Sequence, residues 1–96
     1  MRDEFRFVWD HGKAALNLQK HGVSFLTAAE ALAGQTVEWI DDRESYGEER
    51  YIALGRVDLA VYRVVYSLPD EGVIRIISAQ KAGKHERKQY CGELYT

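Results

Sequence analysis

The sequence predicts an α+β domain with a mainly antiparallel sheet, its elements in the order β-α-α-β-β-β-β-α. Two short segments with helix-capping residues stand near the N-terminus, and a run of segments rich in β-branched and aromatic residues follows them. A helical segment rich in Lys and Arg closes the chain. Runs of strands after runs of helices are typical of α+β folds, and a chain of 96 residues fits one domain, over 1–96.

Capping residues mark out the elements of the first third. Asp10 and Ser24 are the expected N-caps of two helices. Gly22 is expected to end the first helix as a C-cap, since glycine takes the left-handed conformation without a steric penalty, and Gly34 is expected to end the second. Asn17, in the first helix, is expected on its polar stripe. The expected elements are a strand over 5–9 and helices over 11–21 and 25–33.

After the second helix the pattern changes to that of strands. An acidic loop over 41–48 and the Pro69–Gly72 turn separate the segments. The last strand is apolar except for Arg75 and Ser78, so it is expected in the middle of the sheet. The expected elements are strands over 36–40, 50–57, 60–68 and 73–79 and a helix over 83–90.

Composition excludes several classes of protein. Hydrophobic residues make up 46% and charged residues 29%, which argues against a disordered chain. Cys91 stands alone and allows no intrachain disulfide, and the few His residues offer no metal-ligand spacing. No apolar stretch approaches the roughly 20 residues of a membrane span, and no signal-peptide segment is visible. A cytoplasmic protein that needs no metal or cofactor is expected.

The net charge of −2 hides an uneven distribution. Six acids stand against one Arg over 38–49, whereas five bases stand against two acids from residue 73 onward. Such asymmetry is compatible with one surface for a polyanion and another for a basic partner. The alternative, that both are ordinary solvated surfaces, stays open.

Several segments and single residues of the sequence resemble those of the BrnT family. They are Phe7-Val8-Trp9-Asp10, Lys13, Asn17, Lys20-His21-Gly22-Val23-Ser24-Phe25, Gly47-Glu48-Glu49-Arg50, Gly55, Arg75-Ile76-Ile77-Ser78-Ala79, Glu86-Arg87 and Tyr90. The resemblance implies a RelE-like fold and a toxin of a type II toxin–antitoxin system that cleaves RNA without a metal and inhibits translation. It also implies a BrnA-like ribbon-helix-helix antitoxin, through which alone the pair would bind operator DNA.

One position departs from the family. Where the family usually reads Ser-Ala-Arg-Lys-Ala after the last strand, this chain has Gln80 in place of the arginine. A planar, permanently charged guanidinium has become a neutral amide. If that arginine helps to hold a phosphate, this chain is expected to be weaker, or Lys81 or Lys84 supplies a point charge instead.

Cleavage of RNA without a metal needs a base for the 2′-hydroxyl, cations at the phosphate and an acid for the leaving oxygen. The candidate catalytic residues are His21, Glu49, Arg50, Arg75, Lys81 and Glu86. The candidate RNA-binding residues are Lys20, Lys84, Arg87, Lys88 and Tyr90. In the acidic loop, Asp41, Asp42 and Glu44 are the expected docking surface for a basic segment of the antitoxin.

Each catalytic candidate has a structural alternative. His21 also suits a helix C-terminus, where it would interact with the last carbonyls. Glu49 and Arg50 should point to opposite sheet faces if a strand begins there. A buried guanidinium is costly, so Arg75 either pairs with a loop acid or faces solvent and awaits an anion.

The last helix poses a similar choice. Glu86 and Tyr90 are four residues apart, so they either form a base with an orienting hydroxyl or attach the helix to the sheet; for Tyr90 the structural role is favoured. The nuclease hypothesis as a whole requires one anion pocket shared by scattered cations. An Arg75 locked against an internal carboxylate, far from the lysines of the last helix, would overturn it.

Two rival functions remain. The first alternative to the ribonuclease toxin is a catalytically weak binding module, as Gln80 would suggest, which acts only through its antitoxin in operon autoregulation. The second is an unrelated small RNA-binding domain. Growth arrest on expression without a partner distinguishes a toxin from a binding module.

Overall fold

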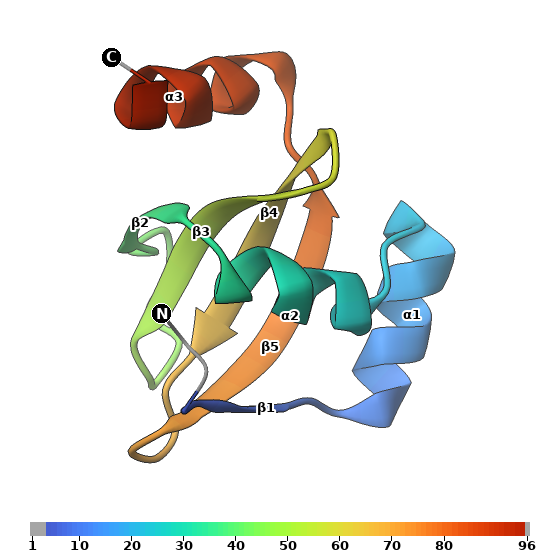
Figure 1. Cartoon of the computed structure of the whole chain (residues 1–96). Helices are drawn as coiled ribbons and strands as arrows, with labels where there is room; N and C mark the ends of the chain where they lie inside the picture. The colour runs from blue at the N-terminus through green and yellow to red at the C-terminus, as the bar shows by residue number, and fades with distance from the viewer. Residues whose placement is uncertain (1–3, 96) are drawn as a thin grey trace.

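The computed structural model describes residues 4–95 as one five-stranded sheet with three helices (Figure 1). The element order is the predicted one. The strands are β1 (Arg6–Val8), β2 (Thr36–Ile40), β3 (Arg50–Val57), β4 (Ala60–Ser67) and β5 (Val73–Lys81). The helices are α1 (His11–His21), α2 (Phe25–Ala33) and α3 (Lys84–Tyr95).

The sheet has the strand order β1-β5-β4-β3-β2. All neighbouring strands are antiparallel except β1, which runs parallel to β5 with Arg6 opposite Val73. The expectation of a mainly antiparallel α+β fold is therefore confirmed. The apolar β5 has a strand on either side, as its composition predicts.

The predicted caps define the two N-terminal helices. The side chain of Asp10 accepts a hydrogen bond from the Lys13 backbone N–H at 2.8 Å, and Ser24 does the same for its own helix. Gly22 has a φ of 70°, and its N–H donates to the Leu18 carbonyl, which closes α1. These local signals fix both helix boundaries at the expected residues.

The inner face of the sheet carries the main core. Helix α2 crosses this face and α1 lies beside β5 (Figure 1). Leu32 of α2 and Val64 and Ile74 of the sheet are fully buried there. Gly55 permits the close approach of α2 to β3, because a Cβ at this position would lie 2.5 Å from the Ala31 carbonyl oxygen.

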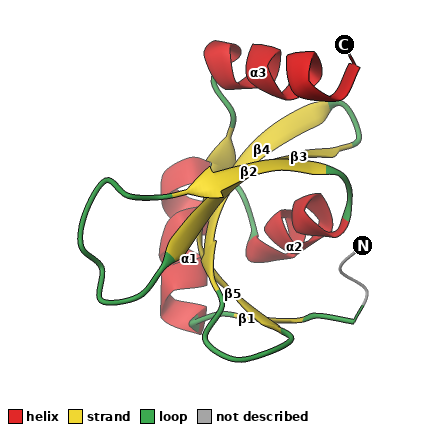
Figure 2. Cartoon of the chain, turned by 90° about the vertical axis from the view of Figure 1, so that its left-hand side faces the viewer, coloured by secondary structure: helices red, strands yellow, loops and turns green. Residues whose placement is uncertain are grey.

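The outer face, the opposite side of the sheet, is covered by a helix only at one end. Helix α3 lies at this end of the sheet (Figure 2). The buried ring of Tyr90 packs there with Leu54 and Val61. The remainder of the outer face carries side chains that alternate with the core residues of β3, β4 and β5. This face is where most of the charged side chains of the sheet lie.

A bulge in β5 changes which of its residues share a face. Val65 stands opposite Ser78 and Tyr66 opposite Ile76, so Ile77 is an extra residue in the ladder. Simple alternation along the strand would put Arg75, Ile77 and Lys81 on one face, and the bulge shows that this expectation is wrong. Beyond the bulge the alternation is shifted by one residue, and Arg75 shares the outer face with Gln80.

Asn17 corrects a second expectation. It lies on the buried side of α1, not on a polar stripe, and it is only 7% exposed. Its Nδ2 donates to the carbonyls of Val23 and Ala79, and its Oδ1 accepts from the Ala79 N–H. The amide thus takes the place of a neighbouring strand along β5 beyond the short β1.

The other boundaries differ by a few residues. Strand β5 extends to Lys81 because its last residues still pair with β4, and α3 continues to Tyr95. Within residues 4–95, no helix is long and apolar enough to span a bilayer.

Candidate active site

Three polar side chains form a row across the outer face at the end of the sheet remote from α3. Arg50 of β3 stands opposite Ser67 of β4, and Ser67 stands opposite Arg75 of β5. Directly opposed residues in a sheet point to the same face with Cβ atoms about 5 Å apart. The antiparallel register therefore brings together two arginines and a hydroxyl from three strands.

One carboxylate joins the two arginines. Glu48 lies in the loop before β3 and forms an ion pair through Oε1 with the Arg75 Nη2. Its Oε2 lies 3.5 Å from the Arg50 Nε. Two guanidinium groups and one carboxylate leave the cluster with a net positive charge.

The cluster is open to solvent on one side. The side chains of Arg75 and Glu48 are 41% and 30% exposed, and that of Arg50 is 24% exposed. The Arg50 guanidinium also stacks on the Tyr46 ring, 4.1 Å from its centre, and this contact fixes its plane. The arrangement is ordered, positively charged and accessible.

Two polar atoms of the row lack hydrogen-bond partners. The Arg50 Nε and the Ser67 Oγ are buried, and neither has a hydrogen bond within the part of the chain that the structure describes; the Arg50 Nε has only its ion pair with Glu48, whereas the Ser67 Oγ has no partner there. Buried polar atoms are nearly always paired, so an unpaired one calls for an explanation such as a ligand. In the strand register Ser67 stands between Arg50 and Arg75, the two arginines that Glu48 contacts.

A second ion pair lies further along the outer face. Arg63 of β4 pairs with Glu86 of α3, with 3.1 Å between the Arg63 Nε and the Glu86 Oε2. Gln80, the position that departs from the family, stands directly opposite Arg63 in β5. The outer face thus places a guanidinium from the adjacent strand next to that neutral amide.

The predicted basic cluster forms only in part. Arg50 and Arg75 come together, and the pairing of Arg75 with a loop acid is confirmed. Lys81 does not join them. Because of the bulge, Gln80 lies on the outer face with Arg75, and Lys81 lies on the inner face. Lys84 and Lys88 are exposed on α3, beyond the far end of β5.

This separation rules out the expected single pocket shared with the lysines of the last helix. The carboxylate against Arg75 is nevertheless in a surface loop and partly exposed, not internal. The basic group that the structure does bring together is the smaller one of Arg50 and Arg75, with Ser67 between them.

Glu49 and Arg50 point away from each other, as expected. Tyr51 donates a hydrogen bond from its hydroxyl to the Glu49 carboxylate at 2.8 Å, and this bond raises the pKa of Tyr51. Tyr51 also stacks on Tyr66 of the inner-face core. Glu49 is thus directed away from the two arginines.

The remaining candidates on the helices lie apart from the arginine row. Lys20 and His21 are exposed in the last turn of α1, and Arg87 donates from Nη1 to the Ala82 carbonyl at the start of α3. Tyr90 is 3% exposed and donates to the Gln35 carbonyl, so its expected contact with RNA is wrong and its structural role is confirmed. Glu86 accepts from the Gly83 N–H and pairs with Arg63.

The acidic loop is partly internal. Asp41 has a fully buried carboxylate that accepts hydrogen bonds from the Arg43 side chain at 2.6 and 2.7 Å. The guanidinium of Arg43 lowers the pKa of Asp41 to about 2. Asp41 therefore cannot be part of a docking surface as expected, whereas Asp42 and Glu44 are exposed.

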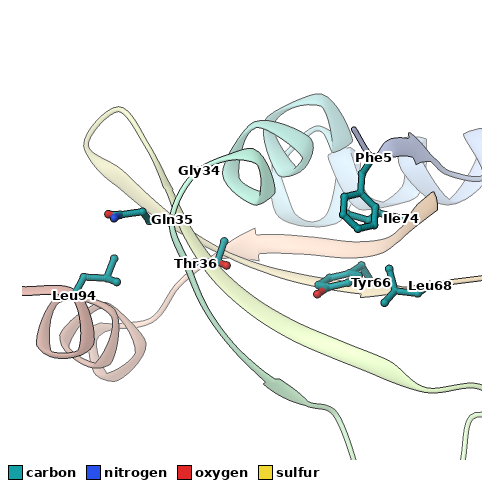
Figure 3. A pocket seen from close by; sticks show the side chains of 8 residues that line it. All are labelled: Phe5, Gly34, Gln35, Thr36, Tyr66, Leu68, Ile74 and Leu94. Atoms are coloured by element: carbon teal, nitrogen blue, oxygen red, sulfur yellow. The ribbon is translucent and has the colours of Figure 1, made fainter. Parts of the chain in front are cut away.

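A cavity of about 560 Å³ opens elsewhere, between the N-terminal segment, the start of β2 and α3 (Figure 3). Its lining is mostly apolar and consists of Phe5, Gly34, Gln35, Thr36, Tyr66, Leu68, Ile74 and Leu94. It contains none of the arginines described above.

Comparison with known proteins agrees with this architecture. A family model described as "Ribonuclease toxin, BrnT, of type II toxin-antitoxin system" matches residues 9–86. The chain belongs to the BrnT family. A search of curated protein sequences found no match.

The BrnT fold is also seen in a solved structure. The crystal structure of the Brucella abortus ribonuclease toxin BrnT aligns with a TM-score of 0.62 and 20% sequence identity. The alignment covers 83% of this chain and 99% of the Brucella chain. At this identity the likeness shows the fold.

Four residues of the two arginine groups on the outer face were not among the candidates from the sequence. They are Tyr46, Glu48, Ser67 and Arg63. Glu48 carried a usable signal, because it is an acid of the loop two positions before Arg50 and the pairing of Arg75 with a loop acid was one of the two alternatives expected. Ser67 and Arg63 had only their alternation with the core residues of β4, which becomes informative once the register is known.

Proposed function

We propose that the chain is an endoribonuclease that binds an RNA phosphate at Arg50, Ser67 and Arg75 and cleaves without a metal ion. The observation that carries the proposal is that the strand register places the Ser67 Oγ, a buried hydroxyl with no hydrogen-bond partner among the described residues, between the guanidinium groups of Arg50 and Arg75. The hydroxyl and both guanidinium groups can donate. A phosphate oxygen is the acceptor that suits such a set.

Glu48 is the carboxylate best placed for the chemistry. It contacts both arginines, so a phosphate that enters the row lies next to it. In the proposed reaction the 2′-hydroxyl gives its proton to Glu48, and the 2′-oxygen attacks phosphorus. The bond to the 5′-oxygen breaks, and that oxygen takes a proton from water at the open face.

The arginines act on the charge that develops in this step. Two guanidinium groups fixed by the sheet and by Tyr46 are already aimed at the phosphate before the pentavalent state forms. Such preorganised cations commonly supply the largest part of catalysis. The products are a 2′,3′-cyclic phosphate and a 5′-hydroxyl.

The test is cleavage of RNA by the purified protein in EDTA, with analysis of the new ends. Arg75→Ala should lower kcat/KM by at least about a hundredfold, and Arg75→Lys should restore little because an ammonium lacks the guanidinium fork. Lys13→Ala, which removes an exposed cation from α1, is the control and should cleave normally. A 3′-hydroxyl product, or a requirement for magnesium, would refute the mechanism.

We also propose that a BrnA-like ribbon-helix-helix antitoxin neutralises the chain and carries the pair to operator DNA. Expression alone should stop growth and translation, and co-expression of the antitoxin should restore them; a harmless wild-type chain would favour a binding module. The exposed Asp42 and Glu44 remain the proposed contacts for a basic antitoxin segment. Reversing both to lysine should weaken the complex and leave RNA cleavage intact.

A further inference from the structure

Arg63 lies on the same face as the proposed phosphate site but at a distance from it. It is four positions before Ser67 in β4, which corresponds to about 13 Å along an extended strand. Even-numbered separation keeps both side chains on the outer face. The β3 and β4 register places Arg63 opposite Leu54, at the edge of the area that α3 covers.

The surface between the two arginine groups is uncharged. The middle row of the outer face consists of Trp39, Ile52, Val65 and Ser78. Ile52 and Val65 are nearly fully buried, and Trp39 and Ser78 are partly exposed. The two cationic positions are therefore separate, joined by a strip that offers an aromatic ring and a hydroxyl.

Both cationic positions are built in the same way. In each, an arginine of the central strands pairs with a carboxylate from a covering segment, Glu48 from a loop and Glu86 from α3. Arg63 and Glu86 are 16% and 26% exposed, so water reaches the pair. A carboxylate in such a pair is a counter-ion that a phosphate can replace.

Glu86 has a second attachment that survives such an exchange. Its Oε1 accepts a hydrogen bond from the Gly83 N–H at 2.9 Å, at the N-terminus of α3. If a phosphate takes over the guanidinium of Arg63, this capping bond still holds the Glu86 side chain to its helix. Release of Arg63 therefore does not require α3 to detach.

We propose that Arg63 forms a second phosphodiester-binding subsite on the outer face, occupied by the same RNA strand a few nucleotides from Arg50 and Arg75. The inference rests on the proposed ribonuclease function, because it assumes that an RNA strand crosses this face. It adds a length requirement: RNA long enough to reach both positions binds more tightly than a dinucleotide.

The test measures Kd for a non-cleavable 2′-O-methyl RNA of ten nucleotides and for a dinucleotide. Arg63→Gln should weaken binding of the long RNA about tenfold, which corresponds to about 1.4 kcal/mol. The slope of log Kd against log salt concentration should fall by the contribution of about one phosphate contact. Binding of the dinucleotide should not change. Lys13→Gln is the charge-matched control and should alter neither.

Glu86→Gln separates a binding role from a merely structural one. The amide keeps an oxygen for the Gly83 N–H but no longer competes for Arg63, so the long RNA should bind more tightly. If the ion pair only holds α3 in place, both substitutions lower stability and affect the two RNAs alike. An unchanged Kd for the long RNA in Arg63→Gln, or weaker binding in Glu86→Gln, overturns the proposal.

The experiments can refute the catalytic site and the second subsite independently of each other. If Arg75→Ala cleaves normally while Arg63→Gln still weakens binding of the long RNA, the second subsite stands and the catalytic assignment falls. If the wild-type chain binds neither RNA, both are overturned.

Discussion

Asn17→Ala is expected to be one of the most damaging single substitutions in this domain. The side chain makes three hydrogen bonds in a buried position, two through Nδ2 at 2.8 and 2.9 Å and one through Oδ1 at 3.1 Å. Alanine leaves the carbonyls of Val23 and Ala79 and the Ala79 N–H without these partners. At about 1 kcal/mol net for each bond, the loss is about 3 kcal/mol.

Urea unfolding measures this loss. Domains of this size have a total stability of about 5–15 kcal/mol, so the midpoint should fall clearly at an unchanged slope. Gln19→Ala, an exposed position on the same helix, is the control and should change stability by less than about 0.5 kcal/mol. Asn17→Asp should be no better than alanine at neutral pH, because it points a carboxylate oxygen at two carbonyls. A loss below about 1 kcal/mol for Asn17→Ala would refute this reasoning.

Three further outcomes are expected. Because the folded pKa of Asp41 is about 2 against an ordinary 3.8, its ion pair stabilises the fold fully above about pH 4 and is lost as the pH falls toward 2; unfolding of Asp41→Asn should therefore depend less on pH in that window. Gly55→Ala should destabilise by about 1–3 kcal/mol, measured by urea unfolding, since its Cβ would meet the Ala31 carbonyl; no change would show that α2 can shift. Tyr90→Phe should cost about 1 kcal/mol in thermal unfolding through its bond to Gln35, and an unaltered midpoint would contradict that.

Local signals explain why the element order and most boundaries could be predicted. Asp10, Gly22 and Ser24 act on their own helices through bonds within a few residues, so they are visible in the sequence. The same holds for the separation of Glu49 from Arg50, which follows from the alternation of a strand. None of these inferences needs the partner strand.

The site depended on features that act at a distance. The bulge at Ile77 reverses the alternation of β5, and nothing in the neighbouring residues predicts it. Lys81 was therefore expected beside Arg75 and lies on the other face. Asn17 looked polar and exposed because its partner, Ala79, is 62 positions away.

The parallel pairing of β1 with β5 also governs when the molecule can fold. Strand β1 is made before β5 and finds its partner only when Val73 and the residues after it have been made. Arg75, in the same late strand, completes the row that Arg50 and Ser67 begin. Until β5 has been made, the five-stranded sheet is incomplete and the proposed anion site is not assembled, so synthesis itself delays the appearance of the proposed activity.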